Sequence, residues 1–387
     1  MNIGMLTWEF PPRIVGGIAR HCNGLARALA HNGHDVHVVT LDFPGAPIYE
    51  EFNGINVYRA STELGHPNFL TWAFLFNHFL EKKLAGVSRN VDFDVVHVHD
   101  WLTGFAGISF KHQMQKPLVS TIHGTEIGRA QGLHNPDSLT IDGIEWWTTY
   151  EANKIIVTSA SMKAEIQGHF HLPPEKIEIV PNGIDTKRYN ASVDQSAVKG
   201  RYGVHPDEKL VLCVGRLVPQ KGIEYLIRAV SRIAERYPEA KFIIVGEGWL
   251  RGHLEYIARS TGHQWKITFT GWIPDQELIA LLNSADALVV PSIYEPFGIV
   301  ALEGMAAGVP VVASDVGGLA EIVEHEHTGI LAYSRSPESI AWAVDRVLSD
   351  PNHSKEMAQN AQQMVQKTYS WEAIAIRTAK IYKEVVG

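Results

Sequence analysis

Cysteine is nearly absent from this chain of 387 residues, since only Cys22 and Cys213 occur. Two isolated cysteines cannot build a disulfide framework, so we expect them to be small core residues of a protein from a reducing compartment. The chain also lacks any run of about 18 apolar residues, and its N-terminus has neither the basic segment nor the apolar core of a signal peptide. We therefore expect a soluble cytoplasmic protein with no integral membrane segment.

Basic residues are fewer than acidic residues. The sequence has 34 Lys and Arg against 42 Asp and Glu, which gives a formal net charge of -8 at pH 7. Proteins that bind nucleic acid or anionic membranes normally present a basic face, so this balance argues against both kinds of partner. The sequence contains no indication of an oligomeric state.

Apolar residues, by contrast, make up 45% of the chain, which is long enough to bury two cores. Short apolar runs predict buried parallel strands, and the amphipathic patterns between them predict helices. This alternation indicates an α/β protein with two Rossmann-like, doubly wound domains. The predicted strands lie at residues 3–6, 36–39, 95–98, 118–122, 155–157, 210–214, 242–245, 287–290 and 309–313.

The strands divide into two sets around residues 181–185 and the polar stretch 186–200, which we interpret as the interdomain linker. The predicted domains are therefore residues 1–185 and 186–370, and residues 371–387 have the apolar spacing of a final helix. Open α/β sheets hold their ligands at the carboxyl ends of their strands. We expect the functional residues to follow strands and to face a central cleft between the two domains.

The most informative segment runs from Glu295 to Gly298 and is followed by Glu303. It lies between the predicted strand 287–290 and an apolar helix at 299–307. The first turn of a helix has unpaired N–H groups and a partial positive charge, which suit the oxygens of a phosphate or a sugar. Glu295 can accept hydrogen bonds from hydroxyls, and Glu303 could reach a ribose. The alternative is that both carboxylates only cap and solvate a surface helix.

Two cations follow the predicted strand 210–214. Lys221 is expected at the start of a helix, where its charge opposes the helix dipole by roughly 0.3 to 1 kcal/mol. Arg216 precedes it in the same loop. An anion bound between the two side chains converts this repulsion into attraction, and a diphosphate is the natural anion. The alternative is a pair of solvated surface cations.

Glycine-containing loops follow other predicted strands, and each is a weak signal by itself. Gly246 gives the backbone room to approach a flat or phosphorylated ligand. Backbone atoms around Gly271-Trp272-Ile273 are expected to contact a nucleotide base. The pair Gly16-Gly17 opens a helix but lacks the G-x-G-x-x-G spacing, so NAD binding is disfavoured.

Polar side chains also end two strands of the first domain. His97 and His99 share one face of a strand, which permits a metal site, but no cysteine or second ligand cluster accompanies them. Asp100 and Trp101 suit sugar recognition instead, since a carboxylate binds hydroxyls and an indole packs on a pyranose. His123, after the next strand, could place its imidazole beside a reacting carbon. The sequence therefore favours a sugar site with no metal and no cofactor.

Taken together, these motifs resemble the signature of the retaining, nucleotide-sugar-dependent glycosyltransferases of the GT-B fold, the group-1 family that includes relatives of glycogen synthase. The match runs nearly end to end, and the spacings R-x4-K and E-x7-E are its most specific parts. The motifs that carry it are Gly16-Gly17, His99-Asp100-Trp101, His123, Pro181-Asn182-Gly183-Ile184-Asp185, Arg216 with Lys221, Glu295-Pro296-Phe297-Gly298 with Glu303, and Tyr369-Ser370-Trp371-Glu372.

The resemblance implies that the C-terminal domain binds the nucleotide sugar and the N-terminal domain the carbohydrate acceptor, with the final helix packed back on the N-terminal domain. It implies charge neutralisation of the leaving diphosphate by side chains rather than by a metal. The implied catalytic residues are Arg216, Lys221, Glu295, His123 and Asp100, and the implied donor-binding residues are Gly16, Gly17, Gly246, Ile273, Phe297, Gly298, Ile299, Val300 and Glu303.

Glycogen and starch synthases, which extend α-1,4-glucan from ADP- or UDP-glucose, resemble this chain most in the loop before Gly16 and in His99-Asp100-Trp101. Bacterial glycogen synthases usually carry a lysine two residues before the paired glycines, where this chain has Ile14 beside Arg13. The resemblance therefore implies a hexosyltransferase, with a different sugar or acceptor as the alternative. A two-domain sugar-binding protein and a GT-B epimerase or phosphorylase are the rival classes.

Asp92-Phe93-Asp94 matches the D-x-D pattern that holds a metal under a nucleotide sugar in another glycosyltransferase fold. Here the pattern precedes a predicted strand instead of ending one. We interpret it as a coincidence.

Overall fold

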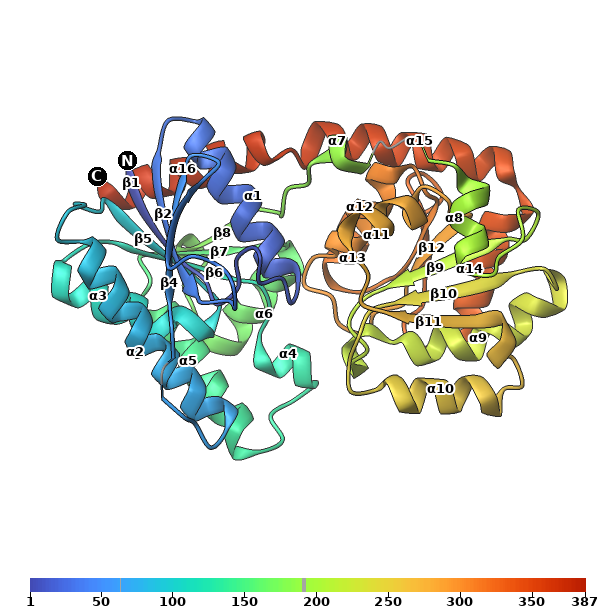
Figure 1. Cartoon of the computed structure of the whole chain (residues 1–387), viewed down its shortest axis with the longest axis horizontal. Coiled ribbons are helices and arrows are strands. Elements are labelled where there is room, and N and C mark those ends of the chain that lie inside the picture. Colours follow the sequence, from blue (N-terminus) through green and yellow to red (C-terminus); the bar gives the residue numbers. More distant parts are fainter. Residues whose placement is uncertain (63, 190–192) are drawn as a thin grey trace. The chain divides into compact units, whose positions relative to one another are not determined.

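The computed structural model describes residues 1–62, 64–189 and 193–387, and its chain divides into two compact units. Unit 1 comprises Met1–Gly183 and Trp371–Gly387, and unit 2 comprises Ile184–Ser370 (Figure 1). The division at 183/184 lies two residues before the boundary expected from the sequence. Each unit is a sheet covered by helices, parallel except for one edge strand of unit 1, which confirms the predicted α/β class with two doubly wound domains.

Unit 1 contains an eight-stranded sheet in the order β3-β4-β2-β1-β5-β6-β7-β8. All neighbouring strands are parallel except β3, which pairs antiparallel with β4. The central strands are buried on both faces, as their Val- and Ile-rich sequences predict. The strands are β1 (Asn2–Leu6), β2 (Asp35–Leu41), β3 (Tyr49–Phe52), β4 (Ile55–Ala60), β5 (Val95–His99), β6 (Leu118–Ile122), β7 (Lys154–Val157) and β8 (Ile177–Ile179).

The last helix of the chain belongs to unit 1, where it packs against the first helix. Trp371 at its start lies over two glycines, because a Cβ on Gly24 or Gly183 would fall within 2.5 Å of the indole ring. The helices of unit 1 are α1 (Gly17–His31), α2 (Phe69–Val87), α3 (Gly104–Met114), α4 (Glu126–Ala130), α5 (Pro136–Glu151), α6 (Ala160–Phe170) and α16 (Trp371–Val386), with 3-10 turns η1 (Trp101–Thr103) and η2 (Pro174–Lys176).

Unit 2 contains a six-stranded sheet, parallel throughout, in the order β11-β10-β9-β12-β13-β14. Three of its strands were predicted with the bounds that the structure shows or within one residue of them. The strands are β9 (Leu210–Val214), β10 (Lys241–Val245), β11 (Ile267–Gly271), β12 (Ala287–Val290), β13 (Val311–Ser314) and β14 (Ile330–Ala332).

The helices of unit 2 bury their apolar faces against this sheet. In α9, the residues Ile223, Leu226, Ile227, Val230 and Ile233 are all buried, as the i, i+3, i+4 spacing predicts. The helices are α7 (Thr186–Tyr189), α8 (Gln195–Arg201), α9 (Ile223–Arg236), α10 (Arg251–Ser260), α11 (Asp275–Leu282), α12 (Ile299–Ala307), α13 (Gly317–Ile322), α14 (Pro337–Ser349) and α15 (Pro351–Thr368), with 3-10 turns η3 (Pro219–Lys221) and η4 (Gln264–Lys266).

The polar stretch 186–200 is not a simple linker. Its described parts form α7 and most of α8, which belong to unit 2, and residues 190–192 lie outside the described residues. The prediction was wrong here because the stretch is polar on average, although Tyr189 and Val198 are buried in the unit 2 core.

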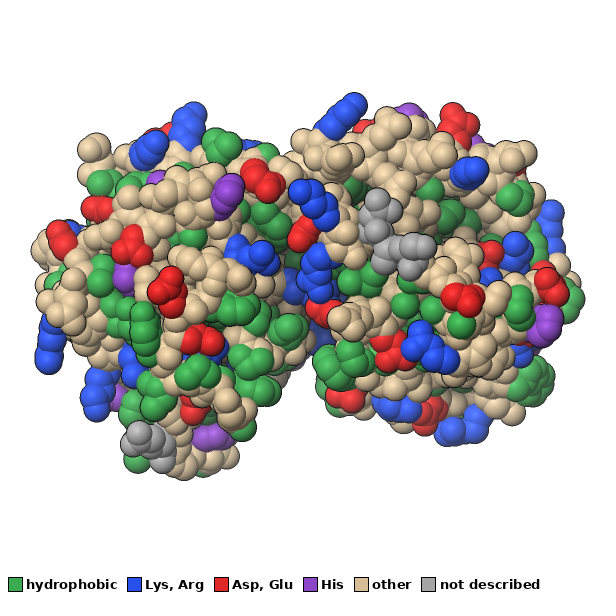
Figure 2. All heavy atoms as spheres, turned by 45° about the horizontal axis from the view of Figure 1, so that its top comes forward, with side chains coloured by type: hydrophobic (Ala, Val, Ile, Leu, Met, Phe, Trp, Pro, Cys, Tyr) green, Lys and Arg blue, Asp and Glu red, His purple; other side chains and the backbone are tan. Residues whose placement is uncertain are grey.

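The surfaces of both units carry mixed charges. Figure 2 shows basic side chains scattered among acidic ones over the visible face of each unit. Among the described residues, no helix combines the length and the apolar character needed to cross a bilayer.

Candidate functional site

Each sheet has one point where the strand order reverses. In unit 2, β9 lies between β10 and β12, and in unit 1, β1 lies between β2 and β5. The loops on the two sides of such a point leave the sheet in opposite directions, which opens room for a ligand at the carboxyl ends of the strands. The residues predicted from the sequence follow these central strands and their neighbours, so the structure places them at the carboxyl edge of the sheet in each unit.

Lys221 and Glu295 form an ion pair in unit 2. Lys221 Nζ donates to Glu295 Oε2 at 2.7 Å, and Ser292 Oγ donates to the same oxygen at 3.1 Å. The lysine follows β9 and the glutamate follows the neighbouring strand β12, although 74 residues separate them in the sequence. Their side chains remain 22% and 11% exposed, so a ligand could still reach both charges.

The sequence predicted Lys221 at the start of a helix, but the structure places it before the helix. It ends the 3-10 turn η3, and α9 begins two residues later, at Ile223, after the left-handed Gly222. Its ion pair with Glu295 also offsets the unfavourable effect of a nearby helix dipole. Arg216, in the same loop, is exposed.

The loops after the strands of unit 2 are held together by their backbones. Ile293 N–H donates to the Gln220 carbonyl at 2.8 Å, and Leu217 N–H donates to the Glu247 carbonyl at 2.8 Å. Gly222 has φ +61°, and a Cβ there would lie 2.0 Å from the Pro291 carbonyl oxygen. The carboxyl edge of this sheet is therefore a single interlocked surface.

Gly246 contributes to the same arrangement. Its φ is +133°, and a Cβ on it would lie 2.0 Å from the Gly215 carbonyl oxygen. Its N–H donates to the Gly271 carbonyl at 2.9 Å, which brings the loop containing Ile273 to the same edge. The space predicted at Gly246 is therefore occupied by a neighbouring loop, and glycine is required for that close approach.

The start of α12 has the predicted geometry. Gly298 has φ 112° and precedes the first helical residue, Ile299. The Ala301 N–H donates to the Gly298 carbonyl at 3.0 Å, whereas the first two N–H groups of the helix, those of Ile299 and Val300, have no intrahelical acceptor and point out of the helix end. Phe297 is only 5% exposed and packs edge-to-face with Tyr369, so its backbone rather than its ring faces this end of the helix.

Glu303 is buried, with 3% of its surface exposed. It is the fifth residue of α12, and its Oε1 accepts a hydrogen bond from the Tyr189 hydroxyl at 2.9 Å. The hydrogen bond fixes the orientation of the carboxylate. Glu303 is therefore not one of the solvated surface groups that the sequence left as an alternative.

Asp100, directly after β5 in unit 1, has an unusual backbone conformation. Its φ is +57°, a region that non-glycine residues rarely adopt. Its Oδ1 accepts the His123 N–H at 2.7 Å, which ties the loop after β6 to the tip of β5. Burial raises the pKa of Asp100 to about 6, against opposing effects of the Arg129 charge and of backbone N–H groups of His123 and Gly124.

Trp101 does not have the expected position. It is only 6% exposed and lies in an apolar cluster with Ala73, Leu102, Ile141 and Ile144. Its indole is therefore part of the core of unit 1, so the prediction that it packs on a pyranose is wrong. The sequence could not show this because the cluster includes residues of α2 and α5, which are distant from Trp101 in the chain.

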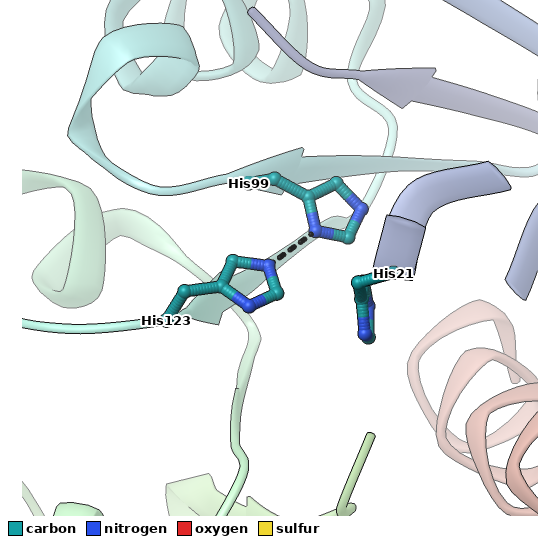
Figure 3. Close-up of side chains that lie close together, drawn as sticks. All are labelled: His21, His99 and His123. Carbon is teal, nitrogen blue, oxygen red and sulfur yellow. Dashed lines mark hydrogen bonds between the residues drawn. The ribbon is translucent and has the colours of Figure 1, made fainter. Parts of the chain in front are cut away.

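Three histidines gather beside Asp100 (Figure 3). His99 Nδ1 lies 3.1 Å from His123 Nε2, and the ring of His21, from α1, lies 4.6 Å from that of His123 between centroids. His21 Nδ1 also lies 2.6 Å from Asn182 Oδ1. Burial lowers the pKa of His123 to about 3, and it lowers those of His21 and His99 well below the usual value. All three rings are therefore neutral near pH 7.

His97 belongs to a separate set of contacts. Its two ring nitrogens lie 2.6 Å from the Tyr382 hydroxyl and 2.7 Å from the Thr121 hydroxyl. Both nitrogens are thus satisfied, and His97 joins β5 and β6 to the C-terminal helix α16. Its role in the structure is to link these elements.

The paired glycines of unit 1 lie beside a carboxylate that the sequence analysis did not single out. Glu9 Oε2 accepts hydrogen bonds from the Val15 N–H at 2.6 Å and the Gly16 N–H at 2.9 Å. Glu9 is 1% exposed, so it fixes the loop ahead of Gly17 from inside the unit.

The D-x-D pattern lies at the amino end of β5, away from the carboxyl edge. Asp94 Oδ2 accepts the Asn2 N–H at 2.7 Å, and Asp92 pairs with Lys116 at 2.7 Å. Both carboxylates thus have structural partners, in agreement with the interpretation as a coincidence.

Five side chains at these sites had no assigned role in the sequence analysis: Glu9, His21, Asn182, Tyr189 and Ser292. Three of them make contacts between residues far apart in the chain: His21 and Asn182 are 161 residues apart, and Tyr189 lies 114 residues from Glu303. A local pattern carries no signal of such contacts. Of the five residues, Asn182 alone belongs to a motif that the resemblance used, Pro181-Asn182-Gly183-Ile184-Asp185.

Comparisons with known proteins match both halves of the chain. Residues 194–364 match the family model for glycosyl transferases group 1, and residues 15–188 match that for glycosyltransferase family 4. An uncharacterised glycosyltransferase of Methanocaldococcus jannaschii is 47% identical over 99% of this chain and 98% of its own length. A glycogen synthase of Mycobacterium tuberculosis is 36% identical over 99% of this chain and 94% of its own.

Among solved structures, the sucrose-phosphate synthase of Thermosynechococcus elongatus superposes with a TM-score of 0.87. It is 27% identical, and the match covers 99% of this chain and 98% of that one. The strand order, the interlocked loops and these relatives agree with one another, and the chain belongs to the group 1 glycosyltransferases of the GT-B fold.

Proposed function

We propose that this protein is a retaining hexosyltransferase that moves a sugar, with glucose as the first candidate, from a UDP- or ADP-sugar to a carbohydrate acceptor, as glycogen synthases do. The observation that carries the proposal is the Lys221–Glu295 pair at the reversal point of the unit 2 sheet, next to the start of α12. A cation, a carboxylate and free helix-end N–H groups are what a sugar diphosphate needs for recognition. The glycogen synthase relative supports the choice of glucose.

Lys221 and Arg216 neutralise the diphosphate in this proposal. The bond between C1 of the sugar and the diphosphate oxygen breaks, and negative charge develops on the leaving group. Two cations close to that oxygen stabilise the transition state more than the ground state, which lowers the barrier. They supply the positive charge that a divalent ion supplies in other transferases, so transfer is proposed to need no metal at the diphosphate.

The carboxylates bind the rest of the donor. Glu295, already oriented by Lys221 and Ser292, accepts hydrogen bonds from sugar hydroxyls. Glu303, oriented by Tyr189, receives the ribose. The acceptor hydroxyl attacks C1 on the face that the diphosphate leaves, its proton passes to the leaving phosphate oxygen, and the anomeric configuration is retained.

Unit 1 supplies Asp100 and His123 and binds the acceptor in this proposal. The Asp100 carboxylate and the neutral His123 imidazole suit hydrogen bonds to hydroxyls of the transferred sugar. The backbone hydrogen bond between the two residues holds them in a fixed relation.

A donor panel tests the proposal directly. UDP-, ADP- and GDP-glucose are each incubated with the protein, with and without glycogen, and nucleotide release and the anomeric configuration of the product are measured. We expect glycogen to stimulate release from the UDP or ADP donor, an α-linked product, and little change on addition of EDTA. The absence of acceptor-dependent release with every donor and acceptor tried contradicts the proposal.

Arg216→Ala provides the residue-level arm of that experiment. Loss of one such charge contact costs on the order of 3 kcal/mol, so turnover should fall about a hundredfold or more. Arg232→Ala is the matched control, because Arg232 is an exposed arginine of α9 that pairs with Glu338 at the surface. Equal activity of the two variants contradicts the role of Arg216.

A different acceptor is the second candidate. Where bacterial glycogen synthases carry a lysine, this chain presents Ile14 and Val15, which are 41% and 47% exposed. An apolar loop beside the paired glycines suits an acceptor with an apolar part better than a polysaccharide end. Small sugars, sugar phosphates and lipid-linked sugars therefore belong in the acceptor panel, and release with one of these but not with glycogen favours this candidate.

A further inference from the structure

The histidine cluster of unit 1, defined as His21, His99 and His123, has features that the sugar site does not require. One ring nitrogen from each residue lies within 4.8 Å of the others. The three residues come from different elements, namely α1, the end of β5 and the loop after β6 (Figure 3). Three convergent imidazoles are a recurrent zinc ligand set.

The hydrogen bond of His21 fixes which nitrogen can bind a ligand. Its Nδ1 lies 2.6 Å from the Asn182 side-chain oxygen, which can only accept, so Nδ1 carries the proton. Nε2 is then left with a lone pair. Within the described part of the chain this Nε2 is buried and has no hydrogen-bond partner. An imidazole whose other nitrogen donates to an oxygen is the usual arrangement of a histidine bound to a metal.

The His99–His123 contact does not satisfy the cluster by itself. A proton shared between His99 Nδ1 and His123 Nε2 explains their 3.1 Å separation. It leaves His21 Nε2 buried and without a partner among the described residues, whereas the unpartnered His99 Nε2 points away from Nδ1 and cannot bind the same ion. Unpaired buried polar atoms are costly, and a cation that accepts lone pairs from the three rings gives the inward-facing nitrogens a partner.

The distances fit a small transition metal. Two nitrogens bound tetrahedrally at about 2.0 to 2.1 Å from zinc are about 3.3 Å apart. The 3.1 Å between His99 Nδ1 and His123 Nε2 is close to this value, and the His21 nitrogen, within 4.8 Å of the other two, moves toward them when the ion binds.

We propose that His21, His99 and His123 form a binding site for one divalent transition metal ion, with Zn²⁺ as the first candidate, and that Asn182 orients the His21 ligand. The partly exposed side of His123 leaves the fourth position to water. His97 is excluded as a ligand because both of its nitrogens are engaged. If the proposed function holds, an ion there would also occupy His123, so zinc would inhibit transfer.

Metal titration of the full chain tests the site without reference to activity. Protein freed of metal with a chelator is titrated with Zn²⁺ by calorimetry and with Co²⁺ by visible absorption, which reports tetrahedral nitrogen coordination. We expect one zinc ion per chain with micromolar or tighter affinity, and an intense cobalt spectrum that zinc displaces. Absence of a high-affinity ion in the wild-type protein overturns the proposal.

Variants identify the ligands. His21→Gln and His99→Gln should each weaken zinc binding at least tenfold and abolish the cobalt spectrum. Asn182→Ala keeps all three ligands but removes the orienting oxygen, so it should lower the affinity for zinc about 10- to 100-fold. His205→Gln, at an exposed histidine of unit 2, should change nothing. Retained binding in the His21→Gln/His99→Gln double variant overturns the proposal.

Folding and function are separated in the same experiment. Circular dichroism of each variant shows whether it is folded, and Asn182→Ala provides a ligand-intact variant if a histidine variant fails to fold. Zinc bound to a protein that transfers no sugar supports the site and contradicts only the proposed function. Transfer by a protein that binds no zinc contradicts only the site.

Discussion

Units 1 and 2 have the same plan, a doubly wound sheet with its candidate residues at the carboxyl edge, but the two edges differ in chemistry. In unit 2 the edge carries charge, because Lys221, Glu295 and the exposed Arg216 lie in loops that are locked together. In unit 1 it carries neutral imidazoles, and all the fully buried histidines among the described residues lie in this unit. Unit 2 thus presents paired opposite charges at its edge, whereas unit 1 presents neutral imidazoles beside the single carboxylate of Asp100.

The largest expected effect concerns the charged edge. Lys221→Ala should lower turnover a hundredfold or more, because it removes the cation proposed to lie next to the leaving group and leaves Glu295 without its ion-pair partner. Initial rates at saturating donor measure this, with circular dichroism as the check of folding. Lys241→Ala, at the amino end of β10, is the matched control, and its turnover should fall less than twofold. Equal loss in both variants would show that the charge at the carboxyl edge has no special role.

The interlocked loops predict a difference in stability. Gly222→Ala forces a left-handed φ on alanine and brings Cβ to 2.0 Å from the Pro291 carbonyl oxygen, so we expect a loss of about 3 kcal/mol or more. Gly33→Ala in unit 1 has a similar φ of +82° but nothing within 4 Å of the added carbon. The Gly33→Ala variant should lose only about 1 kcal/mol of unfolding free energy. Urea unfolding compares the two, and equal losses would mean that the loop contact contributes little.

The buried histidines predict sensitivity of unit 1 to acid. The pKa of His123 is about 3 in the folded chain and about 6.5 in the unfolded one, so acid favours the unfolded state. Its stabilising contribution is complete above pH 6.5 and falls by about 2 kcal/mol at pH 5. The raised pKa values of Asp100 and Glu145, about 6 and about 8, act in the opposite direction over this range.

A comparison of variants isolates the histidine term. The difference in unfolding free energy between wild type and His123→Gln should shift by about 2 kcal/mol between pH 7.5 and pH 5, in the direction that favours the variant in acid. His205→Gln in unit 2 should show no such shift. Urea unfolding with pulse labelling reports the two units separately. A shift of the same size in both variants would remove the distinction between the two units.

The smallest expected effect concerns the orientation of Glu303. Tyr189→Phe removes one hydrogen bond to a buried carboxylate, which is worth roughly 1.5 kcal/mol. We expect about a tenfold rise in the KM for the nucleotide sugar with kcat nearly unchanged, because the proposed contact is to the ribose and not to the reacting carbon. Tyr237→Phe, whose hydroxyl binds Asp345 at the surface, is the control. A fall in kcat instead of a rise in KM would place Glu303 in the chemical step.

Strand prediction succeeded in the centre of each sheet and failed at the margins. The strands at 118–122, 210–214 and 287–290 were predicted with their observed bounds, since strands buried on both faces are continuous apolar runs. Of the five strands that were missed, β3, β8, β11 and β14 are edge strands. Edge strands are short and partly polar, as in Tyr49–Phe52, so their sequences lack the signal.

The positions of the site residues could be predicted, but their partners could not. Arg216, Glu295, Asp100 and His123 were placed after strands from local patterns, and the structure finds them there. Trp101 was misassigned because its burial depends on helices distant in the sequence. The spacing between residues determines which face of an element they share, but not which other element covers that face.

The order of residues alone determined that this chain forms two α/β units with glycine-rich and charged loops after their strands, because hydrophobic periodicity and turn chemistry are local properties. The tertiary structure decided which loops meet. Lys221 reaches Glu295 because β9 lies next to β12, although β10 and β11 come between them in the chain. His21 meets His99 and His123 because β1, β5 and β6 are neighbours in the sheet. Strand order is a property of the whole fold, since it depends on the packing of every helix and crossover, and so the pairs that make the site exist only in three dimensions.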